Sequence, residues 1–474
     1  MTSAPSSPEK PERRLPAAFV EMVSAYPALA GLPEALQTEP EVSVRVNGAK
    51  GAAVSVDADR VPWCDEGFYL ADRPAFTLDP ALHQGLYYVQ DASSMVMSLV
   101  AKKLTSDGRP VRWLDACAAP GGKSIAALSV LPAGSVLVSN EFDRRRAGAL
   151  VENLERWGAS NVCVTSGDAA AFSRLPGAFD VVAVDAPCSG EGMMRKEEVA
   201  VSQWSPRLIE QCAETQRNIL RGVWQALRPG GFLVYSTCTF NTTEDEDNVA
   251  WLINEFGAES IDLGLSDLPG VCGAVKGTAS CARFIPGRVR GEGLFIAVLR
   301  RPGDAAVADA PSRGGKKKRD SATASRSAGS APKEWLKGDY AFVSGGEENS
   351  VRAVPAYAAP FFAAVAREMH VIAMGTEVAT VKGRDVIPAF ALAHANDLNV
   401  SVFPTVEADY PTALAILRGE AVALPGAPRG IVLVTYGGRP LAFAKNLGSR
   451  ANNLVPARRR ILSRLTPEVS PKVL

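Results

Sequence analysis

Between Val111 and Arg300 the sequence alternates short apolar runs with longer amphipathic segments, and this alternation limits the fold more than any other feature. The apolar runs have strand length and end in small or acidic residues, as in VRWLDAC, GSVLVSNEF, NVCVTSGD, FDVVAVDAP and GGFLVYSTCTF. Segments with helical spacing lie between them, such as RRRAGALVENLERWG and QRNILRGVWQAL. Strands and helices that alternate in this way build βαβ units, so residues 101–300 are predicted to form an α/β domain with a doubly wound parallel sheet.

The chain on either side of this domain divides into three regions. Residues 1–100 combine a helical pattern, LPAAFVEMVSAY, with a strand that runs into a turn, VSVRVNG, and predict a small α+β module. Residues 301–333 have low complexity and a basic GGKKKRD run, which predicts a flexible linker. Residues 334–474 predict a separate, mainly β domain, in which GIVLVTYGGRPLAFAKN forms a hairpin that turns at a Gly-Gly pair.

Composition narrows the class of protein. The 474 residues carry 51 Lys and Arg against 51 Asp and Glu, so any basic footprint for a nucleic acid must be local. No secretory signal is expected, and no apolar run reaches the roughly 18 residues of a membrane-spanning helix. Eight cysteines without C-x-x-C pairs, and three histidines, favour neither a metal site nor disulfides. We therefore expect a reducing, cytoplasmic compartment, in which a special cysteine acts as a reactive thiol.

The first strand of the α/β domain leads into a loop of small residues, WLDACAAPGGKS, which opens a helix. Small residues let the backbone approach a ligand closely, and a helix N-terminus offers free N–H groups. The loop lacks the glycine spacing of dinucleotide-binding and triphosphate-binding loops. It is expected outside the carboxyl end of its strand, where doubly wound sheets bind their cofactors.

Acidic residues follow the next two strands. Glu141, with Asp143 behind it, can accept hydrogen bonds from ribose hydroxyls, and Asp168 can accept from an adenine amine. Either acid alone is more often a turn or helix cap. Together, after a glycine-rich loop, they favour an adenosine-bearing ligand such as S-adenosylmethionine.

Two cysteines follow the fourth and fifth strands. Cys188 comes just after Asp185, and Cys238 lies at the corresponding place on the next strand, so both thiols are predicted to face one crevice beside the cofactor. A thiolate that adds to carbon 6 of a pyrimidine activates carbon 5 toward a methyl sulfonium, and it can leave again. Asp185 can hydrogen-bond the ring, and a second thiol can help the release. Cys163 and Cys212 are expected to be buried small hydrophobes.

The motifs DACAAPGGKS, DAPCSGEG and YSTCTFNTTEDEDNV resemble, in this order, those of the Sun-related family of RNA cytosine-5 methyltransferases. SVRVNGAKG, VPWCDEGFYL and GLYYVQDASSMV look like the N-terminal module of that family, and RFIPGRVRGEGLFIAVLRR like the closing strand of its catalytic domain. The tail, with KGRDVIPAFALA and PLAFAKNLGSRANNLVPARRR, resembles the RNA-binding domain of the bacterial small-subunit methyltransferase F group. The resemblance implies a Rossmann-like, S-adenosylmethionine-dependent methyltransferase with a PUA-like C-terminal domain.

Carried over by position, the resemblance implies a role for each motif residue. Cys238 would be the nucleophile on carbon 6, Cys188 would aid product release, and Asp185 would hold the cytosine near the methyl donor. Glu141 would meet the ribose of S-adenosylmethionine and Asp168 its adenine. The residues that would wrap this donor are Cys117, Ala118, Ala119, Pro120, Gly121, Gly122 and Lys123. Lys123 would also orient Asp185.

The resemblance implies methylation of carbon 5 of cytosine in RNA, with 16S ribosomal RNA or the small ribosomal subunit as partner, by a monomer without a membrane partner or metal. Methylation of transfer RNA and a non-catalytic RNA-binding or ribosome-assembly role are the alternatives. A DNA methyltransferase is disfavoured, because those enzymes attack from the proline-cysteine motif. The chain departs from the family at Gly287, where a histidine is common.

The target cytosine must be flipped or unpaired, because a stacked base cannot be attacked from above its plane. Local basic candidates for phosphate contacts are Arg45, Arg195-Lys196 and the terminal ARRR. Trp63, Tyr87 and Tyr88 either stack on bases or pack in the core. The acidic run after Cys238 is expected to cap the following helix.

Overall fold

The central element of the fold is a nine-stranded sheet, seen in a computed structural model that describes residues 14–53, 58–304, 331–346, 349–471 and 473. Its strands are β4 (Arg112–Asp115), β5 (Val136–Glu141), β6 (Val162–Ser166), β7 (Phe179–Asp185), β8 (Leu227–Thr237), β9 (Glu259–Ser260), β10 (Cys281–Phe284), β11 (Leu294–Arg300) and β14 (Val371–Met374). The order is β10-β11-β8-β7-β4-β5-β6-β14, and β9 pairs with β11.

Strands β4 to β8 are parallel, as the sequence predicts. The chain runs from β4 outward through β5 and β6, and then returns to build β7 and β8 on the other side of β4. The sheet is therefore doubly wound, and its order reverses between β4 and β7. All residues of β5 are buried, as is typical of a parallel strand covered on both faces, although its last three residues, Ser139, Asn140 and Glu141, are polar.

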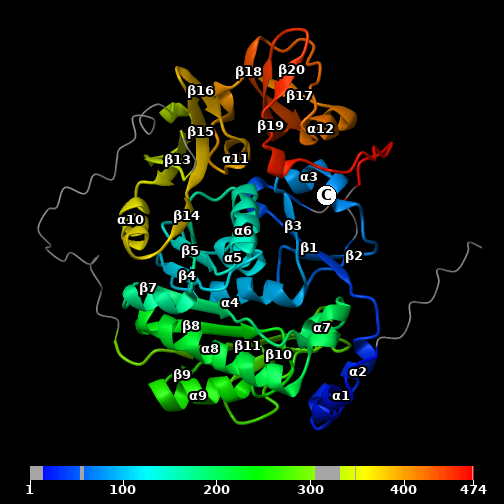
Figure 1. The fold of residues 1–474 in the computed structure, drawn as a ribbon, viewed down its shortest axis with the longest axis vertical. Helices are drawn as coiled ribbons and strands as arrows, with labels where there is room; N and C mark the ends of the chain where they lie inside the picture. The colour runs from blue at the N-terminus through cyan, green and yellow to red at the C-terminus, as the bar shows by residue number, and fades with distance from the viewer. Residues whose placement is uncertain (1–13, 54–57, 305–330, 347–348, 472, 474) are drawn as a thin grey trace, which may run out of the picture.

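Helices cover both faces of the sheet (Figure 1). One face packs against α4 (Val96–Leu104), α5 (Gly122–Leu128) and α6 (Arg144–Trp157), and the other against α8 (Pro206–Ala226), α9 (Glu246–Phe256) and α10 (Ala359–Glu368). Helix α6 shows why these segments are helical: Asp143 caps its first turn, Gly158 ends it in the left-handed region, and its apolar residues recur on one buried face.

The N-terminal region is the predicted α+β module. It contains α1 (Ala17–Ser24), α2 (Leu32–Ala35), α3 (Pro80–His83) and a sheet of order β2-β1-β3, with β1 (Val42–Val46), β2 (Gly67–Leu70) and β3 (Tyr87–Val89). The module docks on the α/β domain through side-chain amides. Asn47 donates to the Trp157 carbonyl at the end of α6 (3.0 Å), and Gln90 donates to the Gly122 carbonyl at the start of α5 (3.1 Å).

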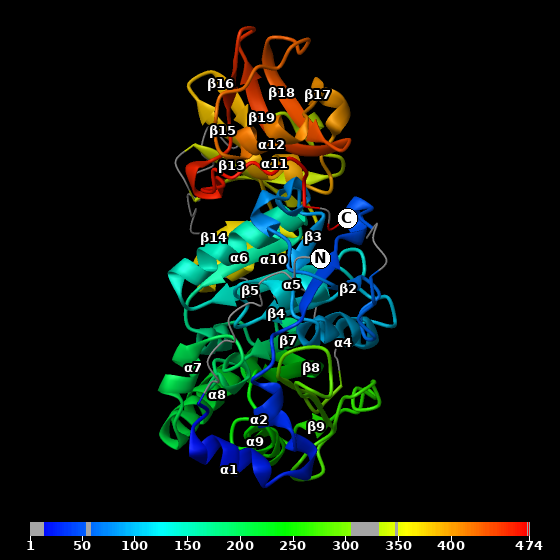
Figure 2. The ribbon, with the colours of Figure 1, turned by 90° about the vertical axis from the view of Figure 1, so that its right-hand side faces the viewer.

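The C-terminal region is mainly β and lies at one end of the molecule (Figures 1 and 2). One sheet has the order β12 (Tyr340–Ser344), β13 (Ser350–Pro355), β15 (Thr376–Lys382), β16 (Asp385–Pro388). The other has the order β17 (Thr405–Glu407), β18 (Gly430–Tyr436), β19 (Arg439–Asn446), β20 (Ala451–Asn453). Helices α11 (Phe390–His394) and α12 (Tyr410–Leu417) accompany them. Strands β18 and β19 form the predicted hairpin.

Two elements of the C-terminal region pack on the α/β domain. Strand β14 extends the central sheet by pairing antiparallel with β6, and α10 buries Phe362 and Val365 in the core of the second face. Strand β6 is the last parallel strand, so β14 covers peptide groups that would otherwise form an open edge. The sequence does not predict this pairing, and a domain boundary at residue 334 stays a prediction. Most of the predicted linker, including GGKKKRD, lies outside the described residues.

Within the described part of the chain, no helix combines the length and the apolar character that a membrane crossing requires.

Candidate active site

A cleft opens at the carboxyl ends of β4 and β7, where the strand order reverses. Its volume is about 170 Å³. The lining residues are Tyr88, Val89, Gln90, Asp91, Ser94, Cys117, Ala118, Ala119, Pro120, Gly122, Lys123 and Asp185. Gly121 turns the loop into α5 with φ +112°, a conformation that disfavours any residue with a Cβ. The cleft therefore brings together most of the loop predicted to wrap a cofactor with the carboxylate predicted to hold a base.

An ion pair lies at the floor of this cleft. Lys123 Nζ lies 2.7 Å from Asp185 Oδ2, and Ser236 donates a hydrogen bond to Asp185 Oδ1 at 2.9 Å. Burial alone would lower the pKa of Lys123, but Asp185, with smaller contributions from Cys238 and Asp91, raises it. Lys123 is therefore charged, and both carboxylate oxygens of Asp185 have a fixed partner.

The two predicted thiols meet beside this pair. Strands β7 and β8 pair in parallel with Asp185 opposite Ser236, and Cys188 and Cys238 follow directly after the strand ends. Their sulfur atoms lie 3.2 Å apart, and both side chains are half-buried. The hydrogen bond to Cys238, burial and the charge of Cys238 raise the pKa of Cys188 well above its usual value. Cys188 therefore holds its proton more tightly than an ordinary thiol and can donate a hydrogen bond to the Cys238 sulfur.

The two predicted adenosine-binding acids lie at the ends of β5 and β6. Glu141 is buried, and its carboxylate accepts from the backbone N–H groups of Ala119 (3.3 Å) and Asp143 (3.0 Å). Asp168 is exposed and accepts from the Ala170 N–H at 2.9 Å. Glu141 thus fixes the cofactor loop to β5, and Asp168 stands at the next strand end along the same edge.

The N-terminal module supplies a wall of the cleft that the sequence motifs do not predict. A Cβ on Gly122 would lie 3.4 Å from both Tyr88 and Gln90, so the glycine makes room for this module as well as for a ligand. Gln90 is buried, and its Oε1 has no hydrogen-bond partner in the described part of the chain. The signal available in the sequence was the family-like segment GLYYVQDASSMV, which carries no chemical motif of its own.

Asp115, at the end of β4, was also missed. It is buried beneath the loop and accepts a hydrogen bond from Ser124 at 2.6 Å. Burial raises the pKa of Asp115 to about 7. The charge of Asp185 raises the pKa of Asp115 and the charge of Lys123 lowers it, so Asp115 is electrostatically coupled to the ion pair of the cleft.

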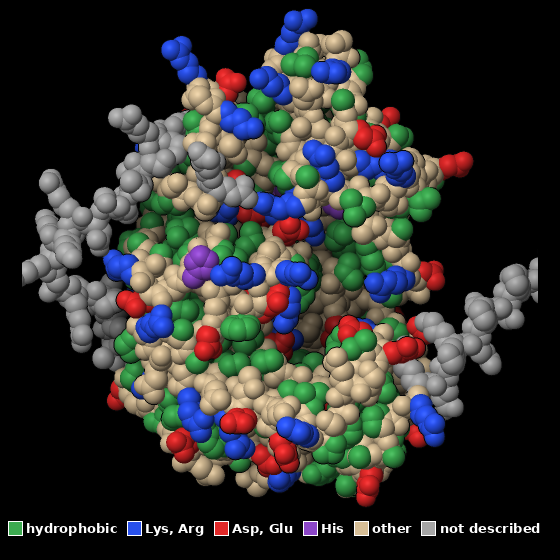
Figure 3. Space-filling model, in the orientation of Figure 1, with side chains coloured by type: hydrophobic (Ala, Val, Ile, Leu, Met, Phe, Trp, Pro, Cys, Tyr) green, Lys and Arg blue, Asp and Glu red, His purple; other side chains and the backbone are tan. Residues whose placement is uncertain are grey.

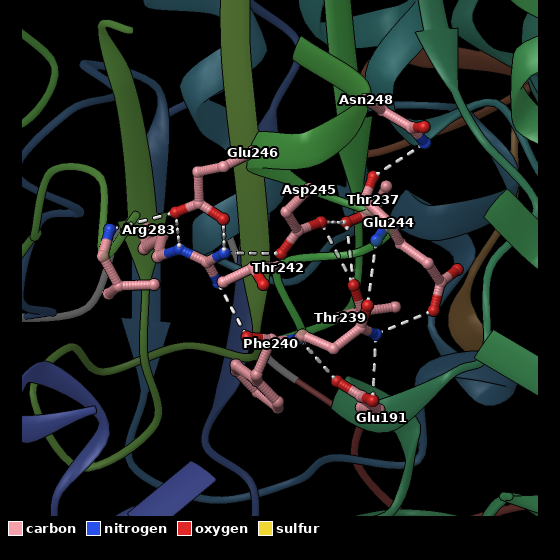
Figure 4. A network of polar contacts seen from close by, with 12 residues as sticks. Glu191, Thr237, Thr239, Phe240, Thr242, Glu244, Asp245, Glu246, Asn248 and Arg283 are labelled. Atoms are coloured by element: carbon pink, nitrogen blue, oxygen red, sulfur yellow. Dashed lines mark hydrogen bonds and ion pairs between the residues drawn. The ribbon is translucent and has the colours of Figure 1, made fainter. Parts of the chain in front are cut away.

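The acidic run after Cys238 lies at the start of α9, and Asp245 points to Thr237, Thr239 and Arg283 (Figure 4). Asp245 occupies the cap position of α9, but its Oδ1 accepts from the hydroxyls of Thr237 (2.5 Å) and Thr239 (3.1 Å). Its Oδ2 lies 2.9 Å from Arg283, which also pairs with Glu246. The predicted position is correct, since Asp245 is the cap residue and Glu246 and Asp247 lie in the first turn of α9, but the Asp245 side chain makes no capping hydrogen bond because it anchors the residues on both sides of Cys238.

Several predicted RNA contacts are wrong because the side chains are buried. Arg45 is fully buried and pairs with Glu66, and Arg195 donates to the carbonyls of Thr38 (3.1 Å) and Glu39 (2.7 Å). Two of the three candidate stacking residues, Trp63 and Tyr87, are also buried. Trp63 packs edge-on against Phe284, and Tyr87 donates to Asp79 at 2.8 Å, whereas Tyr88 does line the cleft.

The terminal arginines are engaged by α6. Arg459 lies 2.5 Å from Glu155, and Arg458 lies 3.9 Å from Glu152. These ion pairs fix the C-terminal region to the α/β domain. Figure 3 shows that Lys and Arg side chains nonetheless predominate on the upper part of one face, over the C-terminal strands. Gly287 lies against α2, where a Cβ would come within 2.9 Å of Ala35.

Among the described residues, no group of three His, Cys, Asp or Glu side chains could hold a metal ion.

Comparisons with known proteins agree with this site over three parts of the chain. The family described as 16S rRNA methyltransferase RsmB/F matches residues 104–300. The N-terminal domain of 16S rRNA methyltransferase RsmF matches residues 15–92, and the methyltransferase RsmF PUA domain matches residues 403–461.

Individual relatives give the same picture. Ribosomal RNA small subunit methyltransferase F of Klebsiella pneumoniae (strain 342) is 32% identical over 417 residues, which cover 84% of this chain and 83% of that protein. The protein of the same name from Cronobacter sakazakii is 36% identical over 320 residues, or 63% of this chain and 65% of that protein. A solved methyltransferase homologue from Pyrococcus horikoshii is 28% identical with a TM-score of 0.51, covering 60% of this chain and 94% of that one.

These matches confirm the predicted fold and the resemblance on which it partly rested. They also confirm the predicted cofactor, because methyltransferases of this fold take their methyl group from S-adenosylmethionine. The chain belongs to the ribosomal RNA small subunit methyltransferase F family.

Proposed function

We propose that this protein methylates carbon 5 of a cytosine in 16S ribosomal RNA, through a covalent bond between Cys238 and carbon 6 of the base. The observation that carries the proposal is the pair of sulfur atoms 3.2 Å apart beside the Lys123–Asp185 ion pair. Among the described residues both thiols are free cysteines, and neither belongs to a group that could hold a metal ion. The choice of RNA rests on the names of the relatives, and we propose a cytoplasmic monomer as the acting form.

The residues of the cleft fit S-adenosylmethionine. The small residues from Cys117 to Gly122 leave backbone exposed beside the cleft, and Gln90 offers an unpartnered buried acceptor. Glu141 and Asp168 stand at the next two strand ends, where ribose and adenine bind in doubly wound sheets. Bound there, S-adenosylmethionine supplies an electrophilic methyl group for carbon 5.

Cys238 is the nucleophile of the proposed reaction. A cytosine flipped out of its stack enters the cleft, and the Cys238 thiolate adds to carbon 6. Asp185 hydrogen-bonds the base and favours protonation at nitrogen 3, so that the electron pair of the ring collects on carbon 5. Lys123 and Ser236 hold the Asp185 carboxylate in one orientation.

Cys188 acts in the release of the product. Two causes of its raised pKa, the hydrogen bond and the charge, come from Cys238. Both disappear once the Cys238 sulfur is bonded to carbon, while burial and the charge of Glu244 remain, so in the proposed step Cys188 loses its proton more readily than before and gives it to water. The resulting thiolate removes the proton of methylated carbon 5, the electron pair forms the double bond to carbon 6, and the Cys238 thiolate leaves.

The test uses transfer of tritium from labelled S-adenosylmethionine to 16S ribosomal RNA or isolated small subunits. The wild-type protein should label the RNA, and bisulfite sequencing should locate the label at cytosine. Cys238→Ser should reduce the rate at least about 10³-fold, because an alcohol replaces the nucleophile. Cys188→Ser should accumulate an RNA–protein adduct that survives denaturing gels.

Equal labelling by wild type and Cys238→Ser would overturn the nucleophile assignment. Labelling of transfer RNA with ribosomal RNA left unlabelled would overturn the proposed substrate.

A further inference from the structure

The two thiols sit on separate loops that are joined by buried carboxylates. The loop after β7 carries Cys188, followed by Ser189 and Glu191, and the loop after β8 carries Cys238, followed by Asn241 and Glu244. Each carboxylate belongs to one loop and binds groups of the other. Neither carboxylate lines the cleft, and both act on the thiols through the loops, while the charge of Glu244 also raises the pKa of Cys188.

Glu191 reaches from the first loop to the second. Its Oε2 accepts from the backbone N–H groups of Phe240 (2.6 Å) and Asn241 (3.0 Å), directly after Cys238. Its Oε1 accepts from the Trp204 indole and the Asn241 amide, both at 3.0 Å. The carboxylate is fully buried, and all four contacts are N–H donors.

Glu244 reaches back from the second loop to the first. Its Oε2 accepts from the backbone N–H of Ser189, the residue after Cys188, at 3.0 Å, and from Gln216 at 2.7 Å. Its Oε1 accepts from the Asn241 amide at 2.8 Å. Asn241 therefore bridges the two carboxylates.

A direct backbone contact completes the junction. The Gly192 N–H donates to the Cys238 carbonyl at 2.7 Å. The backbone on both sides of the thiol pair is thus bound across the gap, at Ser189 on one side and at Cys238, Phe240 and Asn241 on the other.

We propose that Glu191, Glu244 and Asn241 are positioning residues that clamp the two loops together and set the distance between the Cys188 and Cys238 sulfur atoms. The inference rests on the proposed function, because the distance matters only if both thiols act on one base. We call these three residues the loop clamp.

The chemistry of the loop clamp requires carboxylates. Four N–H donors around Glu191 satisfy both of its oxygens only in the ionised form. Gln at position 191 or 244 would turn an NH₂ group toward donors, which breaks up to two of the contacts and leaves buried donors unpaired. Such a loss frees one loop from the other without touching either thiol.

The consequence differs between the two steps of the reaction. Attack on carbon 6 needs Cys238 alone, whereas release needs Cys188 within reach of the adduct formed at Cys238. A displacement of about 1 Å costs on the order of 10²-fold in rate. A loosened loop clamp should therefore slow release more than attack, and the covalent adduct should accumulate although Cys188 is present.

The experiment compares Glu244→Gln with Glu198→Gln, a matched change at an exposed residue of α7 (Glu198–Gln203). The first readout is the distance itself. Diamide oxidises two close thiols to a disulfide, taking up two electrons and two protons, and mass spectrometry follows the Cys188–Cys238 link. We expect this link to form at least about 10-fold more slowly in Glu244→Gln than in wild type.

The second readout compares the rate of methyl transfer in a single turnover with the rate in multiple turnover, which also requires product release. Glu244→Gln should retain most of its single-turnover methyl transfer but lose about 10-fold or more in multiple turnover, with a gel-stable adduct. Glu198→Gln should match wild type in both assays. Asn241→Ala removes the bridge and the acceptor of the Glu244 N–H but leaves both carboxylates with backbone donors. It should show the same pattern more weakly, and it replaces Glu244→Gln if that variant does not fold.

The outcomes separate this inference from the proposed function. If Cys188→Ser gives the adduct but both clamp variants form the disulfide and turn over like wild type, the loop clamp is refuted and the mechanism stands. If Cys188→Ser gives no adduct and Cys238→Ser stays active, the proposed function itself is refuted. Equal losses of single and multiple turnover in folded clamp variants would also refute the inference.

Discussion

The substitution Gly192→Ala tests how closely the position of Cys238 is set by its neighbours. The Gly192 N–H donates to the Cys238 carbonyl at 2.7 Å, and a Cβ on Gly192 would lie only 2.8 Å from that same oxygen. The backbone of Gly192 is not in the left-handed region, so alanine can adopt its conformation. The substitution therefore acts by pushing on the backbone of the proposed nucleophile.

The size of the effect follows from the contact. Ordinary van der Waals contact begins at 3.4 Å, so the Cβ and the carbonyl must separate by about 0.6 Å. Since 1 Å of misplacement costs on the order of 10²-fold, we expect kcat to fall about 10-fold. Overpacking of this kind should also lower the free energy of unfolding by about 1–3 kcal/mol.

The assay is methyl transfer to 16S ribosomal RNA under saturating S-adenosylmethionine, together with urea unfolding. The control is Gly148→Ala in α6, where a Cβ meets nothing within 4 Å. This control should stabilise the protein by roughly 0.5–1 kcal/mol without changing kcat, because alanine is the better helix former. A Gly192→Ala protein with wild-type kcat would show that Cys238 is not held by this contact.

Three further predictions concern stability. Because burial raises the pKa of Asp115 to about 7, the native state binds more protons than the unfolded state between about pH 4 and 7, and its free energy of unfolding falls as the pH rises through this window. Asp115→Asn should therefore gain stability relative to wild type by about 3 kcal/mol between pH 5 and 8 in urea unfolding, and a difference independent of pH would contradict this. Arg283→Met should lower the free energy of unfolding by about 3–5 kcal/mol, because it leaves the buried carboxylates of Asp245 and Glu246 without their cation. Lys102→Met, which breaks an exposed pair, should change it by less than about 1 kcal/mol, and equal effects would refute the reasoning. A chain that ends at residue 304 should aggregate in size-exclusion chromatography, because it uncovers the β6 edge and the core beneath α10, and a soluble, monomeric truncation with an unchanged melting temperature would show that the C-terminal region is dispensable for folding.

The secondary structure near the site could be predicted because its signals are local. The apolar runs at β4, β5, β6, β7 and β8 and the cap, stripe and terminal glycine of α6 lie within a few residues of the elements that they specify. Parallel strands end at one edge, so the order of the motifs along the chain was enough to expect Asp185, Cys188 and Cys238 near the cofactor loop.

Burial and distance could not be predicted in the same way. The sequence suggests Arg45 and Arg195 as phosphate ligands. In the structure both are buried, because they bind partners from other segments of the chain. The same holds for Glu191 and Glu244, whose partners lie up to 55 residues away along the chain.

The sequence by itself determined the doubly wound sheet, the cofactor loop and the identity of the two thiols, because each depends on a pattern within one strand, helix or turn. Only the tertiary structure decided that the thiols lie 3.2 Å apart, that buried carboxylates join their loops, and that β14 completes the central sheet. These features depend on how distant segments pack, and packing is a property of the whole chain that no single segment encodes.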